Sequence, residues 1–182
     1  MDKSKMEVLA VIPARGNSKS IPRKNVKELA GFPLIAYSIA AALQSRRVTR
    51  VIVSTDDEEI AEVARQFGAQ VPFMRPDEFA QDQTPDLPVF EHALTWLREN
   101  EDYEADVVIQ LRPTSPIRPR NCIDNAVALL VEHSDADCVR GVVTAGQNPY
   151  KMWSIQPGGE LAPILTVEGI KEAYNAPRQD LP

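Results

Sequence analysis

The chain has 182 residues, of which 43% are hydrophobic and 25% charged, and this size and composition suit one globular domain with a sizeable core. The formal net charge of −6 disfavours non-specific binding to nucleic acid or to a membrane surface, because both depend on basic patches. The two cysteines form no CxxC pattern, the N-terminus has no signal-like segment, and no apolar stretch approaches the ~20 residues of a membrane-spanning helix, so we expect a soluble cytoplasmic protein with reduced thiols.

In chain order, the first expected element is a strand at residues 7–13, where a continuous apolar run is typical of a buried strand in a parallel sheet. A polar loop follows over 14–31. A helix is then predicted from Pro33, which is well tolerated at a helix start, to about Arg46. The next strand is predicted at 50–54, and the next helix at 57–67.

The alternation continues through the rest of the chain. Further strands are predicted at 70–74, 105–111 and 137–144, and further helices at 87–100 and 121–132. From residue 148 the pattern changes, and two short runs around a Gly158-Gly159 turn indicate either a hairpin or an irregular excursion within 151–167. Strands that alternate with helices of this length predict right-handed βαβ units. We therefore expect a single domain over residues 1–182, built as a Rossmann-like three-layer α/β/α sandwich with a mostly parallel sheet.

The polar loop after the first strand carries the strongest chemical signal. It places the cations Arg15, Lys19, Arg23 and Lys24 among small residues such as Ser18. In open α/β sheets, ligands bind beyond the carboxyl ends of the strands, so cations and free backbone amides at this place indicate a cradle for a polyphosphate. The loop has neither the GxxxxGK[ST] nor the GxGxxG pattern, so neither a Walker loop nor a dinucleotide cofactor is indicated. A solvated basic loop is the alternative.

Ordered short motifs extend from this loop along the chain. The loop itself reads Pro-Ala-Arg-Gly-Asn-Ser-Lys-Ser-Ile-Pro-Arg-Lys-Asn over 13–25. The later motifs are Ser54-Thr-Asp56, Arg75-Pro76, Asp82, His92-Ala-Leu94, Pro113-Thr-Ser-Pro-Ile-Arg118 and Pro177-Arg-Gln179. In this order, over essentially the whole chain, they resemble the signature of the acylneuraminate (CMP-sialic acid or nonulosonic acid) cytidylyltransferases, which have the nucleotide-diphospho-sugar transferase type of fold.

The resemblance implies an enzyme in which the anomeric hydroxyl of a nonulosonic acid attacks the α-phosphate of CTP, releasing pyrophosphate, with Mg²⁺ as cofactor. Catalytic roles are implied for Arg15, Lys24 and Arg178. Nucleotide-binding roles are implied for Ala14, Ser18, Lys19, Asn25, Arg75, Thr84 and Asp86. Sugar-binding roles are implied for Arg112, Thr114 and Arg178. The product would be a CMP-activated sugar for surface glycans.

The resemblance also sets an expectation for the end of the chain. Members of the family continue past a Pro-Arg-Gln segment and carry a later Asp pair that helps to hold magnesium. That pair would lie beyond Pro182, so we expect no metal ligands within this chain. We also expect that the family's C-terminal segment is absent here and that the full-length protein is a homodimer.

One residue departs from the family pattern. The family usually has glutamine immediately before Pro-Thr-Ser-Pro, facing the sugar, whereas this chain has Arg112. An arginine is longer, always charged and fork-shaped as a donor. Our hypothesis is that the sugar differs from N-acetylneuraminic acid at the substituent that Arg112 meets. The alternative is a salt-bridged arginine with a packed stem.

Several residues have structural alternatives. Arg75 and Pro76 could stiffen a loop, and Asp86 could be the N-cap of the helix at 87–100. Asp56-Asp57 suggests a metal site, but Thr55-x-x-Glu58 and Asp56-x-x-Glu59 fit capping boxes, which we favour. His92 and His133 are interpreted as structural.

Two alternatives to the implied function stay open. One is a nucleotidyltransferase for another sugar acid, and the other is a non-catalytic nucleotide-binding homologue. The fold does not separate them, because α/β sheets host many chemistries.

Overall fold

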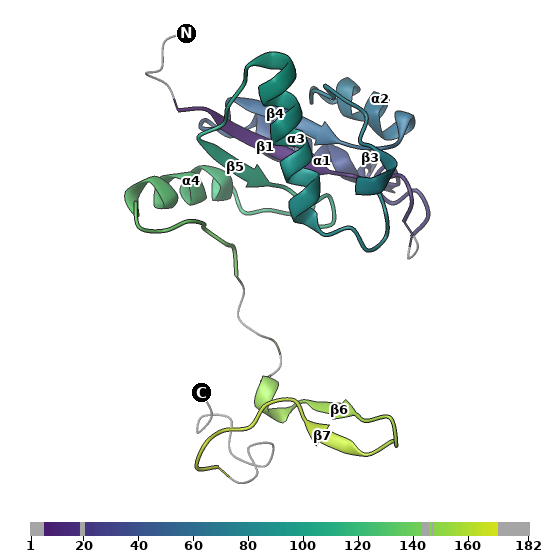
Figure 1. Cartoon of the computed structure of the whole chain (residues 1–182), viewed down its shortest axis with the longest axis vertical. Helices are drawn as coiled ribbons and strands as arrows, with labels where there is room; N and C mark the ends of the chain where they lie inside the picture. The colour runs from purple at the N-terminus through teal and green to yellow at the C-terminus, as the bar shows by residue number, and fades with distance from the viewer. Residues whose placement is uncertain (1–5, 19–20, 143–145, 147, 171–182) are drawn as a thin grey trace. The chain divides into compact units, whose positions relative to one another are not determined.

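The structure of the chain is a computed structural model that describes residues 6–18, 21–142, 146 and 148–170. The chain divides into two compact units, the first ending at Val139 and the second beginning at Arg140 (Figure 1).

The first unit is built on a three-stranded parallel sheet. Its strands are β1 (Val8–Pro13), β4 (Arg50–Ser54) and β5 (Val107–Gln110), in the order β4-β1-β5. In the centre of the sheet, Val11 of β1 pairs with Ile52 on one side and Gln110 on the other. The buried strand predicted from the continuous apolar run is confirmed, because Val8 to Ile12 are all buried.

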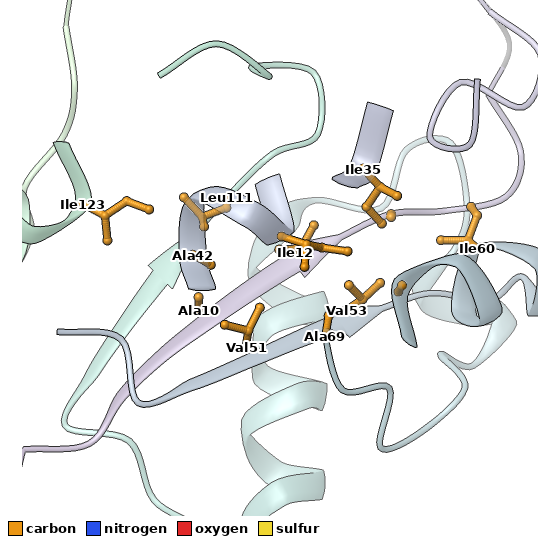
Figure 2. Packing of buried hydrophobic residues seen from close by; sticks show 13 residues of the cluster. Ala10, Ile12, Ile35, Ala42, Val51, Val53, Ile60, Ala69, Leu111 and Ile123 are labelled. Carbon is orange, nitrogen blue, oxygen red and sulfur yellow. The ribbon is translucent and has the colours of Figure 1, made fainter. Parts of the chain in front are cut away.

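One face of the sheet is covered by three helices. Ala10 and Ile12 of β1 point to this face and pack in one cluster with side chains from α1 (Leu34–Leu43), α2 (Glu58–Gln66) and the first turn of α4 (Cys122–Glu132) (Figure 2). Because side chains alternate along a strand, the neighbouring residues of β1 must point to the opposite face.

The opposite face is covered by α3 (Asp86–Glu101), which crosses the sheet in Figure 1. Leu9 and Val11 of β1 pack there in a second cluster with Ala93 and Leu97. Helices on both faces of a parallel sheet make a three-layer α/β/α sandwich. The predicted fold class is therefore confirmed.

The loop after β1 contains a small element that the sequence did not predict. Strands β2 (Glu28–Leu29) and β3 (Phe32–Pro33) pair antiparallel around Gly31, whose φ of +85° suits a residue without a side chain. Pro33 ends this ribbon and is also the N-cap residue of α1.

Two predicted strands are not strands in the structure. Residues 70–74 make only two isolated parallel bridges, Ile52 with Gln70 and Thr55 with Met74. The bridges lie on either side of Pro72, which has no N–H to donate to a continuous ladder. Residues 137–142 of the predicted strand 137–144 are largely exposed and unpaired, and the rest lies outside the described residues. A strand needs a neighbouring backbone, and β5 is the last strand of this sheet in the described residues.

The second unit contains the predicted hairpin. After a short 3₁₀ helix, η2 (Pro149–Lys151), the strands β6 (Trp153–Ile155) and β7 (Leu161–Pro163) pair antiparallel. Gly159 in the connecting turn has a φ of +90°, as the predicted glycine turn requires. In both units together, the described residues include no helix that is long and apolar enough to cross a membrane.

Candidate active site

A cavity of about 380 Å³ lies at the carboxyl ends of the parallel strands in the first unit. Three segments line it: the loop after β1, the segment that follows the bridge at Met74, and the residues after β5. Its lining includes the predicted site residues Arg15, Ser18, Lys24, Asn25, Arg75, Thr84, Asp86, Arg112 and Thr114. Segments distant in the sequence thus meet where ligands of open α/β sheets bind.

Of the other predicted site residues, only Ala14 is described, and it does not line the cavity. Ala14 belongs to the core, with 1% of its surface exposed, and its N–H donates to the carbonyl oxygen of Ser54 at 3.0 Å. Lys19 and Arg178 lie outside the described residues.

Asn25 closes the loop after β1. Its side chain donates from Nδ2 to the carbonyl oxygen of Arg15 at 2.9 Å, and its own carbonyl accepts from the N–H of Ile35 at 2.9 Å. Asn25 is only 6% exposed, so these bonds are shielded from water. The backbone of the loop is therefore fixed near Arg15 and Lys24.

Gly16 packs against the start of α2. Its N–H donates to Oδ1 of Asp56 at 3.0 Å, and a Cβ at Gly16 would lie 2.6 Å from Oδ2 of Asp57. Only glycine permits this approach without movement of the loop or the helix.

Asp57, rather than Thr55 or Asp56, caps α2. Its Oδ1 accepts from the N–H of Ile60 at 3.0 Å. The predicted capping boxes are therefore wrong in position, because Asp56 turns to Gly16 instead. The carboxylate of Asp57 also binds Arg23, and this contact is the main cause that lowers the pKa of Asp57. Arg23 also binds Glu59, so this cation of the loop is tied to α2.

Arg15 forms an ion pair across the cavity. Its Nη1 lies 2.8 Å from Oδ1 of Asp82, and both side chains are about one-third exposed. The sequence motifs included Asp82 but assigned it no role. Its place among them was the signal that could have identified it as a site residue. Gln81 and Phe79, which also line the cavity, carried no comparable signal.

Arg75 lies at the buried side of the cavity, with 6% of its surface exposed. Its guanidinium donates to Oγ of Ser54 at 3.0 Å, to the Ser54 carbonyl oxygen and, at 3.4 Å, to the Phe79 carbonyl oxygen. Burial is the largest influence on this group and lowers the pKa of Arg75 to about 10. It remains charged at neutral pH, so Arg75 both stiffens the loop, as the structural alternative held, and contributes positive charge to the cavity.

Asp86 is not the N-cap of α3, so that structural alternative is wrong. It is the first residue of the helix, and the N-cap is Pro85, which has no side-chain cap. Oδ2 of Asp86 accepts from Nε2 of Gln110 at 2.8 Å and from Nη2 of Arg112. The salt bridge of the structural alternative for Arg112 is present, but its side chain is 59% exposed, so the packed stem of that alternative is not.

Arg118 and Ser38, to which the sequence assigned no such role, form hydrogen bonds with the backbone of Arg112. Its carbonyl oxygen accepts from Nη2 of Arg118 at 2.9 Å and from Oγ of Ser38 at 3.3 Å. A third bond, from Nη1 of Arg118 to Oγ of Ser38 at 3.1 Å, closes the network.

Thr84, another predicted site residue in the cavity lining, is also hydrogen-bonded. Its Oγ1 donates to the carbonyl oxygen of Glu78 at 3.3 Å.

The cavity does not fit a metal ion held by protein ligands alone. No group of three or more His, Cys, Asp or Glu side chains that could hold a metal occurs in the part of the chain that the structure describes. The two carboxylates in the cavity lining, Asp82 and Asp86, are paired with Arg15 and Arg112. His92 contacts Phe73 at a ring-centroid distance of 4.8 Å, and burial lowers its pKa, so it is neutral at pH 7. These contacts support a structural role.

The chain is similar to known cytidylyltransferases over most of its length. A sequence model of the family described as cytidylyltransferase matches residues 9–152, which include every residue lining the cavity. The CMP-N,N'-diacetyllegionaminic acid synthase of Legionella pneumophila is 46% identical over 124 residues, 68% of this chain and 53% of that protein. The N-acylneuraminate cytidylyltransferase of Escherichia coli is 38% identical over 141 residues, 78% of this chain and 32% of that protein. The chain thus spans about half the length of the Legionella relative and less of the second.

A solved structure has the same fold. The CMP:2-keto-3-deoxy-manno-octonic acid synthetase complexed with CTP superposes with a TM-score of 0.58 at 26% identity, covering 70% of this chain and 48% of that chain. The family that the sequence motifs predicted is confirmed. The chain belongs to the cytidylyltransferase family.

Proposed function

We propose that this protein transfers CMP from CTP to the anomeric hydroxyl of a sialic-acid-like nonulosonic acid and releases pyrophosphate. The observation that carries the proposal is the gathering of Arg15, Lys24, Arg75 and Arg112 around one cavity at the carboxyl ends of the strands, in a chain of net charge −6. The named activities of the relatives support the same reaction, although each of those proteins is longer than the matched range.

The reaction places clear demands on the cavity. The oxygen of the anomeric hydroxyl forms a bond to the α-phosphorus and loses its proton to the solvent. The bond from that phosphorus to the bridging oxygen breaks, and pyrophosphate leaves with the electron pair. Catalysis of this step is mostly positioning and neutralisation of charge. We assign the triphosphate to Arg15, Lys24 and Ser18, and we expect Lys19 to join them. The hydrogen bond from Asn25 fixes the backbone of this loop at Arg15, which favours preorganised contacts there.

The two ends of the cavity suit the two substrates. We assign the cytidine to the side formed by Arg75, Thr84 and Asp86, where a carboxylate can accept from the exocyclic amine of cytosine. The sugar is assigned to Arg112 and Thr114 after β5, with Arg178 as the expected partner of its carboxylate. Because Arg112 binds Asp86 in the structure, the two halves of the proposed site are in direct contact.

Three further properties are part of the proposal. Mg²⁺ would enter as the counter-ion of CTP, taking ligands from phosphate oxygens, because magnesium commonly uses few protein ligands in phosphate sites. The full-length protein would be a homodimer. The enzyme would act in the cytoplasm, where CTP is available.

The test is release of pyrophosphate from CTP in the presence of Mg²⁺. The acceptors are N,N'-diacetyllegionaminic acid, N-acetylneuraminic acid and 2-keto-3-deoxy-manno-octonic acid, and ATP, GTP and UTP serve as nucleotide controls. Of the four nucleotides, we expect only CTP to support release of pyrophosphate, with at least one nine-carbon acid as acceptor. The rate of release should fall strongly in Arg15→Gln. It should not fall in Arg98→Gln, which alters an exposed arginine of α3.

Two outcomes would contradict the proposal. Preference for the eight-carbon acid would favour a nucleotidyltransferase for another sugar acid. Binding of CTP without release of pyrophosphate for any acceptor would favour a non-catalytic homologue.

A further inference from the structure

A second cavity of about 480 Å³ lies in the first unit, and none of its lining residues lines the candidate active site. It is bordered by the end of α1, by the turn that follows α1, and by the segment that leads into α4. The residues that line it are Ala41, Gln44, Ser45, Arg46, Arg118, Pro119, Arg120, Asn121, Cys122, Ile123 and Asp124.

The charge of this cavity is opposite to that of the chain as a whole. Three arginines line it, Arg46, Arg118 and Arg120, against the single carboxylate of Asp124. Among the described residues, no salt bridge joins any of these arginines to an acidic side chain. A concave surface lined by one sign of charge concentrates ions of the opposite sign.

The carboxylate of Asp124 is already occupied by the turn after α1. Its Oδ1 accepts from Oγ of Ser45 and from the N–H of Arg46 at 3.1 Å and of Arg47 at 3.3 Å. The bond from Ser45 is the main cause that lowers the pKa of Asp124, so the group is ionised at neutral pH. It holds the turn in place and offsets only part of the charge of three arginines.

Arg118 is held rigidly at the wall of the cavity. Its guanidinium donates to two neutral acceptors, Oγ of Ser38 and the carbonyl oxygen of Arg112. Arg118 is partly buried, and burial lowers its pKa. A guanidinium has five N–H donors in a fixed plane, so a fixed Arg118 can still present donors to an anion at little cost in side-chain entropy.

The start of α4 adds backbone donors at the same place. The N-cap residue, Asn121, has a left-handed conformation with φ of 61° and makes no side-chain cap. N-cap side chains normally accept from the N–H groups of the first turn, and those groups carry the positive end of the helix dipole. Here Ile123 and Asp124 bring the first turn of the helix to the cavity without that cap.

We propose that this second cavity is a binding site for a small phosphate-bearing anion. A phosphate group matches the observations because it carries two charges and several acceptor oxygens, which guanidinium groups and helix N-terminal amides bind in combination. The phosphate could belong to free inorganic pyrophosphate or to a nucleotide such as CMP. The inference does not depend on the proposed reaction, because no residue that lines the second cavity lines the first.

The test is a titration of the full chain with inorganic pyrophosphate, monitored through the amide signals in NMR spectra and, separately, by calorimetry. We expect saturable shifts of the amides of residues 121–124, separate from any shifts around Gly16. In the double variant Arg46→Gln/Arg120→Gln, the affinity for pyrophosphate measured from the amide shifts of residues 121–124 should fall by about tenfold or more. Each charge-assisted hydrogen bond is worth about tenfold in affinity. Arg47→Gln, which alters an exposed neighbour outside the cavity lining, is the matched control and should leave it unchanged.

Parallel titrations with orthophosphate and with CMP separate the two sources of the phosphate. Stronger binding of CMP would assign the site to a nucleotide, and stronger binding of pyrophosphate to the free anion. The proposal is overturned if residues 121–124 do not respond to any of the three, or if Arg46→Gln/Arg120→Gln binds as the wild type does. Arg15→Gln should leave this binding intact, so a failure here is distinguishable from a failure of the proposed reaction.

Discussion

Arg112, which follows β5, binds the carboxylate of Asp86 in the first turn of α3. The same oxygen of Asp86 also accepts from Gln110, so two side chains from the end of β5 hold one carboxylate of the opposite wall. An anionic sugar near Arg112 would compete with Asp86 for the guanidinium. The occupancy of the proposed sugar subsite would thereby alter the charge that Asp86 presents to the proposed cytidine subsite.

Replacement of Arg112 tests whether this pair determines substrate choice. Both side chains are about half exposed, so the free energy of unfolding should change by no more than about 1 kcal/mol in Arg112→Gln. The ranking of acceptor acids by kcat/KM should change, with N-acetylneuraminic acid gaining relative to the others. The measurement is pyrophosphate release for each acid with both proteins. If the wild type already prefers N-acetylneuraminic acid and the variant keeps that preference, Arg112 does not determine specificity.

A methyl group at Gly16 should disturb the proposed phosphate loop. Its Cβ would lie 2.6 Å from Oδ2 of Asp57, so either the loop or the N-cap of α2 must move. Overpacking of this kind costs about 1–3 kcal/mol, and we expect Gly16→Ala to lose both stability in urea and affinity for CTP. Gly141→Ala is the matched control, because nothing lies within 4 Å of a Cβ at that position. If the two variants have equal urea denaturation midpoints and equal affinities for CTP, the close contact with Asp57 does not require glycine at position 16.

The sheet was predictable because its strands are continuous apolar runs, and helices were recognisable where apolar residues recur on one face. The strand at 70–74 could not form, because Pro72 interrupts its ladder. α1 ends at Leu43 rather than near Arg46, because Asp124, far along the chain, binds the amides of the following turn. Such partners depend on the tertiary structure, which local patterns do not contain.

Much of the cavity lining was predicted from ordered motifs, but the partners of those residues were not. Asp86 and Arg112 were assigned to different substrates, and only the packing of α3 beside β5 brings their charges together. Asp57 illustrates the same limit, since three adjacent residues could have capped α2 and the choice depended on where Gly16 and Arg23 lie.

The pH dependence of stability should reveal the contact between Asp57 and Arg23. The folded-state pKa of Asp57 is lowered from 3.8, chiefly by Arg23, so its contribution is present above the unfolded pKa and is lost as pH falls through the folded pKa. Asp57→Asn keeps a cap but loses the charge, so the wild type should be more stable at pH 7, and the difference should shrink below about pH 4. Urea denaturation of both proteins at pH 7 and pH 3 measures this. A difference that is unchanged at pH 3 would mean that the cap geometry, rather than the charge, stabilises α2.

The buried guanidinium of Arg75 should support both stability and nucleotide binding. Arg75→Met removes the donors to Ser54 and Phe79. The Ser54 carbonyl oxygen keeps the N–H of Ala14, but the buried Oγ of Ser54 loses its donor, which costs about 1–3 kcal/mol. Methionine carries no charge, so the variant does not have the cost of burying a guanidinium, the same burial that lowers the pKa of Arg75. This offsets part of the loss, and we expect the net loss in the free energy of unfolding to lie at the lower end of that range.

CTP should bind to Arg75→Met at least about tenfold more weakly than to the wild type, as expected for a lost charged contact. Arg75→Lys should recover part of the CTP affinity but little of the stability, because a single ammonium cannot reproduce the fork-shaped contacts with Ser54 and Phe79. Arg98→Met on α3 is the exposed control for both measurements. A stable Arg75→Met variant with unchanged CTP affinity would remove Arg75 from the proposed site and leave Arg15 and Lys24 as its cationic centre.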